Sequence, residues 1–244
     1  MKLLSIVQQK ASLGGVDSTL KLALSILWNL TDESPTVCQN FIRSQGLELY
    51  MELLETYHSE FSILQKILGL LNNVAEVEYL RPDLMVEELV EHVLSLLTLP
   101  QLPVDIRYFA GGFLAHLSST QGPVWKLDLE LLISLQETLH SSILSWSSPE
   151  QTMVSYKSFQ PFFPLLELSQ CPGVQLWALW AIHFICSQNA PKYCDMLQCE
   201  GGIRKLRILS RHFETHSDVR SLVESILKIL DSNPHPARTE EDIN

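Results

Sequence analysis

Leu27-Trp28-Asn29-Leu30-Thr31-Asp32 is echoed 44 residues later by Leu71-Asn72-Asn73-Val74-Ala75-Glu76. A repeat of this length is typical of stacked helical units. In both copies an asparagine is followed three residues later by an acid, and residues three apart share one face of a helix. The two stretches therefore predict successive helices that each present an amide and a carboxylate side by side.

The composition of the chain supports a buried core and argues against a polyanionic ligand. Of its 244 residues, 46% are hydrophobic and 18% are charged, and the formal net charge is −11. Phosphate binding needs clustered Lys and Arg, so we expect no nucleic-acid partner. The acidic balance favours a ligand that carries a cationic group.

The cysteines indicate a reducing compartment. There are five of them, an odd number, and no CxxC pair occurs. We therefore expect an intracellular protein, cytoplasmic, nuclear or both. The spacing of Cys194, Cys199, His212 and His216 matches no usual zinc pattern, so we predict no metal and no cofactor. We also expect no signal peptide and no membrane span, because no apolar run reaches 18 residues.

Apolar residues recur at helical spacing along most of the chain. The pattern predicts helices over residues 2–10, 17–31, 35–44, 47–57, 61–77 and 83–97. A third copy of the echoed stretch begins at Leu114, and a fourth, weaker copy begins at Ile182 after a longer interval. We predict an all-α fold, a right-handed superhelical solenoid of four to five armadillo-like repeats.

Three segments follow from these patterns. Residues 1–17 are expected to be an N-terminal helix or the edge of a fragment, and residues 18–232 the repeat domain. Residues 233–244 carry too little apolar content to pack, and we expect a disordered tail. The interval 125–170, which three prolines divide, must hold an irregular repeat.

Asn29 and Asn73 have two interpretations. Each side chain can be a buried amide that bonds a neighbouring segment. Alternatively, amides at the same place in successive repeats can pair with the backbone of an extended peptide. The sequence leaves both open.

The acids Asp32 and Glu76 are expected at helix C-termini, where a carboxylate meets the negative end of the helix dipole. An unfavourable position suggests a binding task, although two solvated acids remain an alternative. Trp28 does not recur in the other copies. It is either a core residue or a wall that excludes water from a bound ligand.

Several further residues are candidates for the surrounding groove. They are Asn72, Tyr108, Gly112, His116 and Trp180. We find no phosphate loop, nucleophile elbow or metal motif, so we expect no catalytic residue and no enzymatic activity.

The chain resembles the C-terminal armadillo-like domain of the Zyg-11 family. The similarity rests on the stretches 27–35 and 69–77, on Gln175-Leu176-Trp177-Ala178-Leu179-Trp180-Ala181 and on Glu200-Gly201-Gly202. It covers about residues 18–232. Members of this family are substrate receptors of cullin-2 RING ubiquitin ligases.

The resemblance implies recognition of proteins whose N-terminus is an unmodified glycine, a Gly/N-degron. It also implies that this first residue enters a small pocket formed by Trp28, Asn29, Asp32, Asn73 and Glu76. Family members carry a leucine-rich-repeat region and a cullin-binding box before this domain. Cullin-2 and elongin B/C are therefore expected to bind only through regions that this chain does not contain.

Two other functions are compatible with the sequence. An armadillo-type adaptor could bind internal basic or extended peptide segments, although such adaptors repeat the tryptophan along their groove. A passive scaffold could instead bind a helix in its groove.

Overall fold

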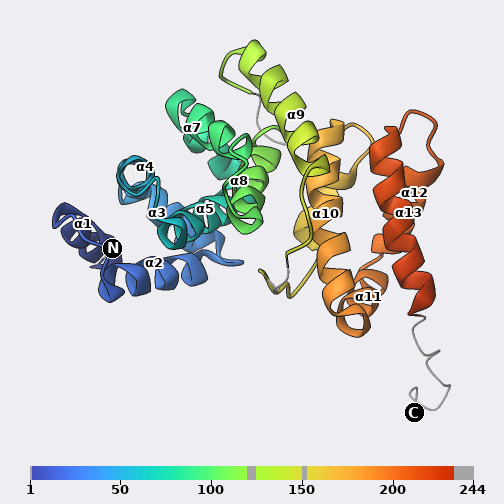
Figure 1. Cartoon of the computed structure of the whole chain (residues 1–244), viewed down its shortest axis with the longest axis horizontal. Helices are drawn as coiled ribbons and strands as arrows, with labels where there is room; N and C mark the ends of the chain where they lie inside the picture. The colour runs from blue at the N-terminus through green and yellow to red at the C-terminus, as the bar shows by residue number, and fades with distance from the viewer. Residues whose placement is uncertain (1, 120–124, 150–152, 234–244) are drawn as a thin grey trace. The chain divides into compact units, whose positions relative to one another are not determined.

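The computed structural model describes residues 2–119, 125–149 and 153–233 (Figure 1). All the regular secondary structure within these ranges is helical, which confirms the predicted all-α class. The described part of the chain contains no helix long and apolar enough to cross a bilayer. Two compact units result, one running to Ser147 and the other beginning at Ser148.

The first unit contains nine α-helices and one short 3-10 helix among its described residues. They are α1 (Lys2–Ser12), α2 (Ser18–Thr31), α3 (Pro35–Arg43), α4 (Gly46–Thr56), α5 (Phe61–Glu76), η1 (Glu78–Leu80), α6 (Arg81–Leu84), α7 (Glu87–Leu97), α8 (Val104–Leu117) and α9 (Leu129–Leu144).

Three long helices form the centre of the first unit. Helix α5 packs against α2 on one side and against α8 on the other, as Figure 1 shows. Their facing side chains are aliphatic and fully buried, for example Leu24, Leu27, Ile67 and Leu71. The echoed stretches of the sequence therefore occupy the C-terminal ends of neighbouring helices.

The connections between these helices follow recognisable local rules. Ser34 is the N-cap of α3 and Pro35 its first residue, a position at which proline needs no hydrogen-bond donor. Gln45 then adopts a left-handed conformation with a φ of 57°. Gly46 follows because a Cβ there would lie 2.5 Å from the ring of Phe41.

In the second unit, a long helix is again followed by two shorter ones, as α2 is followed by α3 and α4. It contains η2 (Gln160–Leu166), α10 (Pro172–Gln188), α11 (Ala190–Cys199), α12 (Gly202–Arg211) and α13 (Ser217–Ser232). Helix α10 packs against α11 and α13, and α12 packs against α13 and η2.

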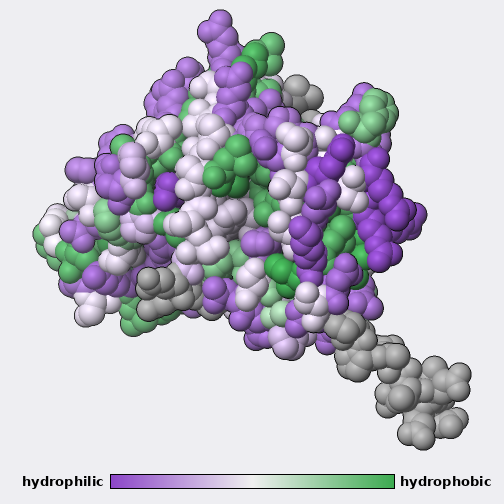
Figure 2. Space-filling view, turned by 45° about the vertical axis from the view of Figure 1, so that its right-hand side comes forward, coloured by the Kyte–Doolittle hydropathy of each residue, from purple (hydrophilic) through white to green (hydrophobic). Residues whose placement is uncertain are grey.

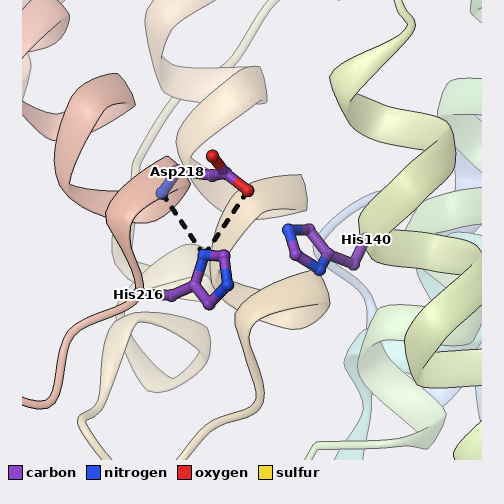
Figure 3. A group of neighbouring side chains, drawn as sticks. All are labelled: His140, His216 and Asp218. Carbon is purple, nitrogen blue, oxygen red and sulfur yellow. Dashed lines mark hydrogen bonds and ion pairs between the residues drawn. The ribbon is translucent and has the colours of Figure 1, made fainter.

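Polar groups order the loops of the second unit. The Glu200 carboxylate accepts hydrogen bonds from the backbone N–H of Phe159 at 2.7 Å and from the Ser158 hydroxyl at 3.1 Å. Helix α13 begins after His216, whose Nδ1 accepts from the backbone N–H of Asp218 at 3.3 Å (Figure 3). These bonds satisfy backbone donors that a loop or a helix start would otherwise leave open.

Some predicted boundaries are wrong. The helix predicted over residues 83–97 is broken into α6 and α7, because Met85 and Val86 leave the helical conformation. Helix α4 begins at Gly46, one residue before the predicted start at 47. Of the expected tail, Asn233 is the C-cap of α13, and residues 234–244 lie outside the described residues.

Candidate functional site

The C-terminal ends of α2 and α5 are tied together by an asparagine. The side-chain amide of Asn73 donates to the carbonyl oxygen of Trp28 and to the hydroxyl of Thr31, both at 3.2 Å. The Thr31 hydroxyl in turn donates to the same carbonyl at 2.7 Å. The NH₂ of Asn73 is thus satisfied by a neighbouring helix, as the first of our two interpretations expects.

The indole of Trp28 is held in one orientation by two contacts. A Cβ at Gly69 of α5 would lie 2.3 Å from its Cε2 atom, so the ring lies directly against the glycine backbone. Its other contact is the ring of Phe109 on α8, edge to face, with centroids 5.0 Å apart at 88°. Trp28 is half-buried, so part of the ring forms a rigid surface.

Glu76 is the most perturbed acid of the described chain. Glu76 is half-buried, and its Oε1 accepts a hydrogen bond from the side-chain amide of Asn72 at 2.9 Å. Burial raises the pKa of Glu76 to about 8 from an ordinary value of 4.5. The Asn72 amide opposes this shift in the pKa, while Asp32 and Glu33 add to it through like-charge repulsion.

Asp32 acts on the pKa of Glu76 from the end of α2. It is the C-cap of α2 and is exposed, and Glu33 after it is held in a left-handed conformation with a φ of 51°. The charges of Asp32 and Glu33, at the end of α2, therefore act on Glu76 at the end of α5. Arg81 is the cation that counteracts them at Glu76, but it is buried, and its Nε donates to the carbonyl of Ala75 at 2.8 Å.

Of the five residues predicted for the pocket, Asn73 donates to the Trp28 carbonyl, and the charge of Asp32 acts on Glu76. Trp28, Asn73 and Glu76 are half-buried, while Asn29 and Asp32 are exposed. Asn29 is thus positioned differently from Asn73, although the two occupy the same place in the sequence echo.

The predicted groove residues lie deeper than a groove wall. Asn72, Tyr108, Gly112 and His116 are buried in the first unit, and of these Asn72 donates to Glu76. Burial and the charge of Arg81 lower the pKa of His116 to about 3, so this imidazole stays neutral. Trp180 belongs to the second unit, where it stacks on Phe184 with centroids 5.4 Å apart.

Four residues that shape the site were not predicted from the sequence. Gly69 and Phe109 fix the indole, and Glu33 and Arg81 set the charge around Glu76. A glycine in a helix interior is a signal for close packing, and Gly69 could have been found from it. Phe109 and Glu33 gave no signal, since a core phenylalanine and an exposed acid are common. Arg81 gave none either, because the sequence alone does not show that it is buried.

Cys38 of α3 contacts the backbone of both α2 and α5 near their C-terminal ends. Its thiol lies 3.5 Å from the carbonyl oxygen of Thr31 and 3.8 Å from that of Asn73. Burial, with a smaller effect of the Glu76 charge, raises the pKa of Cys38 to about 12. The thiol is therefore protonated and packs as a small apolar group.

The sequence as a whole has clear relatives. Residues 1–232 match the family described as Protein zer-1 homolog-like, C-terminal domain. The chain belongs to this family. The resemblance to Zyg-11 proteins seen in the sequence is thereby confirmed.

Two relatives align with nearly the whole of this chain. Zyg eleven-related protein 1 of Caenorhabditis elegans is 30% identical over 226 residues, which cover 93% of this chain and 25% of the relative. Protein zer-1 homolog of Homo sapiens is 29% identical over the same share of this chain and 30% of its own length. The chain thus spans about a quarter to a third of the length of these relatives.

Proposed function

We propose that this zer-1-like domain binds the free N-terminal glycine of target proteins at the ends of α2 and α5. In this proposal its repeats form a right-handed armadillo-like solenoid, with the site on the concave face. The domain would act inside the cell as the non-catalytic, substrate-recognising part of a cullin-2 RING ubiquitin ligase receptor. Cullin-2 and elongin B/C would bind regions outside this chain.

The observation that carries the proposal is the electrostatic interaction of Asp32 and Glu33, at the end of α2, with Glu76, at the end of α5. These like charges repel, and the resulting cost contributes to the raised pKa of Glu76. A ligand cation would relieve that cost. An α-ammonium has a positive charge and three donors, and it suits a site with acceptors from two helices.

The fixed indole supports selection of a small first residue. Trp28 cannot turn toward Gly69, where the glycine backbone already touches it, and Phe109 restrains its edge. A ligand side chain that pushes against such a wall would meet overpacking, which typically costs about 1–3 kcal/mol. Glycine avoids this cost.

The amide of Asn29 supports recognition of the ligand backbone. It is exposed one residue after Trp28, and an amide can accept from a peptide N–H while donating to a C=O. Such pairing ignores side-chain identity, so the proposal expects modest selection after the first residue. Asn73 would act chiefly by holding α2 and α5 together.

A fluorescence-polarisation series that varies only the first residue of a peptide tests the proposal. Gly should bind best, Ser or Ala more weakly, and Leu or acetyl-Gly at least about tenfold more weakly than Gly. Acetylation removes the positive charge with which Asp32 and Glu76 would pair, and with it the charge-assisted hydrogen bonds of the ammonium.

Equal affinity for Gly-, Leu- and acetyl-Gly-peptides would overturn the N-terminal pocket. If basic internal segments then bound, and lost affinity when Asp32 or Glu76 was neutralised, the adaptor function would replace the proposed one. Arg43→Glu, an exposed charge change on α3, controls for general electrostatic effects on the peptides.

A further inference from the structure

Helix α12 in the second unit borders an open groove of about 700 Å³ that is rich in arginine. Its lining is formed by Gln198, Gly201, Ile203, Arg204, Arg207, Ile208, Arg211 and His212. No acidic residue lines it, on a chain whose net charge is −11. Three of the 17 Lys and Arg residues of this acidic chain therefore line one groove.

The three arginines of the groove have no internal task. Arg204, Arg207 and Arg211 are all exposed, and among the described residues no carboxylate pairs with them. Their neighbour Lys205 behaves differently, because it points to η2 and pairs with Glu167 at 2.7 Å. Helix α12 thus has one cation that serves the fold and three that face solvent.

Apolar side chains are exposed beside these cations. Ile208 is 46% exposed within the groove, and Phe213, just after α12, is 82% exposed. The ring of Phe213 stacks on His212 with centroids 5.1 Å apart, so it is held at the rim. Arginine and aromatic residues around an apolar centre are typical of protein interfaces.

The equivalent helix of the first unit shows that the fold does not require arginine here. Gln45-Gly46 and Gly201-Gly202 form the same left-handed junction in the two units, 156 residues apart. At that offset Glu48 of α4 corresponds to Arg204, and Glu55 to Arg211. Two of the three arginine positions are therefore acidic in the first unit, and the third, Arg207, corresponds to Met51.

We propose that the α12 groove is a second docking site, separate from the N-terminal-glycine site, for an acidic segment of a partner protein. Carboxylates of the segment pair with Arg204, Arg207 and Arg211, and an apolar side chain packs on Ile208 and Phe213. The arginines recur at i, i+3 and i+7, which places them along about 10 Å of one helix face. Acids one and two helical turns apart on a partner helix match this spacing.

Charge and shape favour a protein segment over a membrane or a nucleic acid. The three arginines span only about 10 Å of one helix, and an extended polyanion would also meet the rest of a chain whose net charge is −11. Figure 2 turns the α12–α13 end toward the viewer on its right-hand side, where strongly hydrophilic residues gather with apolar residues between them. A short acidic segment with an apolar anchor fits such a surface.

The test uses an N-acetylated helical peptide with glutamates at i, i+3 and i+7 and leucines beside them. The acetyl group keeps it out of a site for free N-termini. Its affinity for the chain is measured by fluorescence polarisation, and its twin carries glutamine at each glutamate. We expect the twin to bind at least about tenfold more weakly and the affinity of the acidic peptide to fall as salt is raised.

Variants of the groove provide the second arm. Arg204→Glu with Arg211→Glu copies residues that stand at the equivalent places of α4, so the helix should tolerate them. We expect this double variant to weaken the acidic peptide by at least about tenfold and to leave Gly-peptide affinity unchanged. Arg43→Glu in the first unit is the control and should change neither affinity by more than about twofold.

Equal binding of the glutamine twin, or an equal effect of Arg43→Glu, would overturn the proposal. Arginine-dependent binding to phosphatidylserine vesicles or to oligo-dT that exceeds peptide binding would also overturn it, in favour of a lipid or nucleic-acid site. A gain in peptide affinity after deletion of residues 234–244, which include Glu240, Glu241 and Asp242, would indicate an occupant within this chain instead of a separate partner.

Discussion

The repeat formed by α2, α3 and α4 and the repeat formed by α10, α11 and α12 share their connections but not their surfaces. Both second helices have a proline within their first two residues, and both third helices start with a buried glycine after a left-handed residue. In both, a Cβ on that glycine would clash, with Phe41 at 2.5 Å or with Leu197 at 2.2 Å.

The side chains on these shared frames have diverged. Asn29 of α2 is exposed, whereas the aligned Phe184 of α10 is buried. Asp32 contributes charge near Glu76, whereas the aligned Ser187 donates a hydrogen bond back to the carbonyl of His183 at 2.8 Å. Backbone turns are therefore the constrained part of the repeat, and its faces are free to acquire different binding chemistry.

The largest expected effect concerns the shared glycine. Gly46→Val and Gly202→Val should each lower the free energy of unfolding by about 1–3 kcal/mol, because the added atoms overlap a packed side chain. Chemical denaturation followed by circular dichroism measures this loss. Gly15→Ala is the control, since nothing lies within 4 Å of its Cβ position. A loss at only one of the two junctions would break the structural equivalence of the repeats.

The next effect concerns the acids that only the first repeat carries. Asp32→Asn should weaken binding of a Gly-peptide by about tenfold, roughly the loss of one charge-assisted hydrogen bond. Calorimetry measures the affinity, and Asp83→Asn, an exposed acid on α6, is the control. Ser187→Asp on α10 should create no such binding. Unchanged affinity in Asp32→Asn would contradict the role of this carboxylate.

The pH dependence of Glu76 should have a defined sign. Because folding raises its pKa from 4.5 to about 8, its unfavourable ionisation lowers the free energy of unfolding as pH rises between these values. Glu76→Gln, which mimics the neutral acid, should therefore melt at a higher temperature than the unmodified chain at pH 9 but not at pH 4. Thermal melts at both values measure this difference.

The affinity for a Gly-peptide should change with pH in the opposite direction to the free energy of unfolding. An ammonium favours ionised Glu76, so Gly-peptide affinity should rise between about pH 5.5 and 7.5 and fall once the α-amino group loses its proton near pH 8. Calorimetry in buffers of different ionisation enthalpy should detect proton release on binding at pH 7. A flat profile would mean that Glu76 does not meet the ligand cation.

The smallest effect concerns the left-handed residue of the junction. Gln45→Gly should raise the free energy of unfolding by up to about 1 kcal/mol, because glycine adopts a positive φ without steric cost. The reciprocal change, Gly201→Gln, should lower it by a similar amount. Denaturation midpoints measure both, and a stabilised Gly201→Gln would show that the two turns differ.

The sequence by itself determined the helical class, most helix positions and the family. Periodic apolar residues and prolines at helix starts are local signals, and they predicted α2, α3 and α5 to within one or two residues. The 44-residue spacing of the echo was also sufficient to assign Trp28, Asp32 and Glu76 to neighbouring helices. These inferences succeed because spacing along a helix fixes which face a residue occupies.

Tertiary structure alone decided what each of these side chains does. The two echoed asparagines differ because α5 lies between α2 and α8, so that Asn73 meets the end of α2 while Asn29 stays exposed. The contact of Trp28 with Gly69 and Phe109 likewise spans three helices. The pKa of Glu76 depends on burial and on charges from another helix, which are properties of packing in space and leave no periodic signal in the sequence.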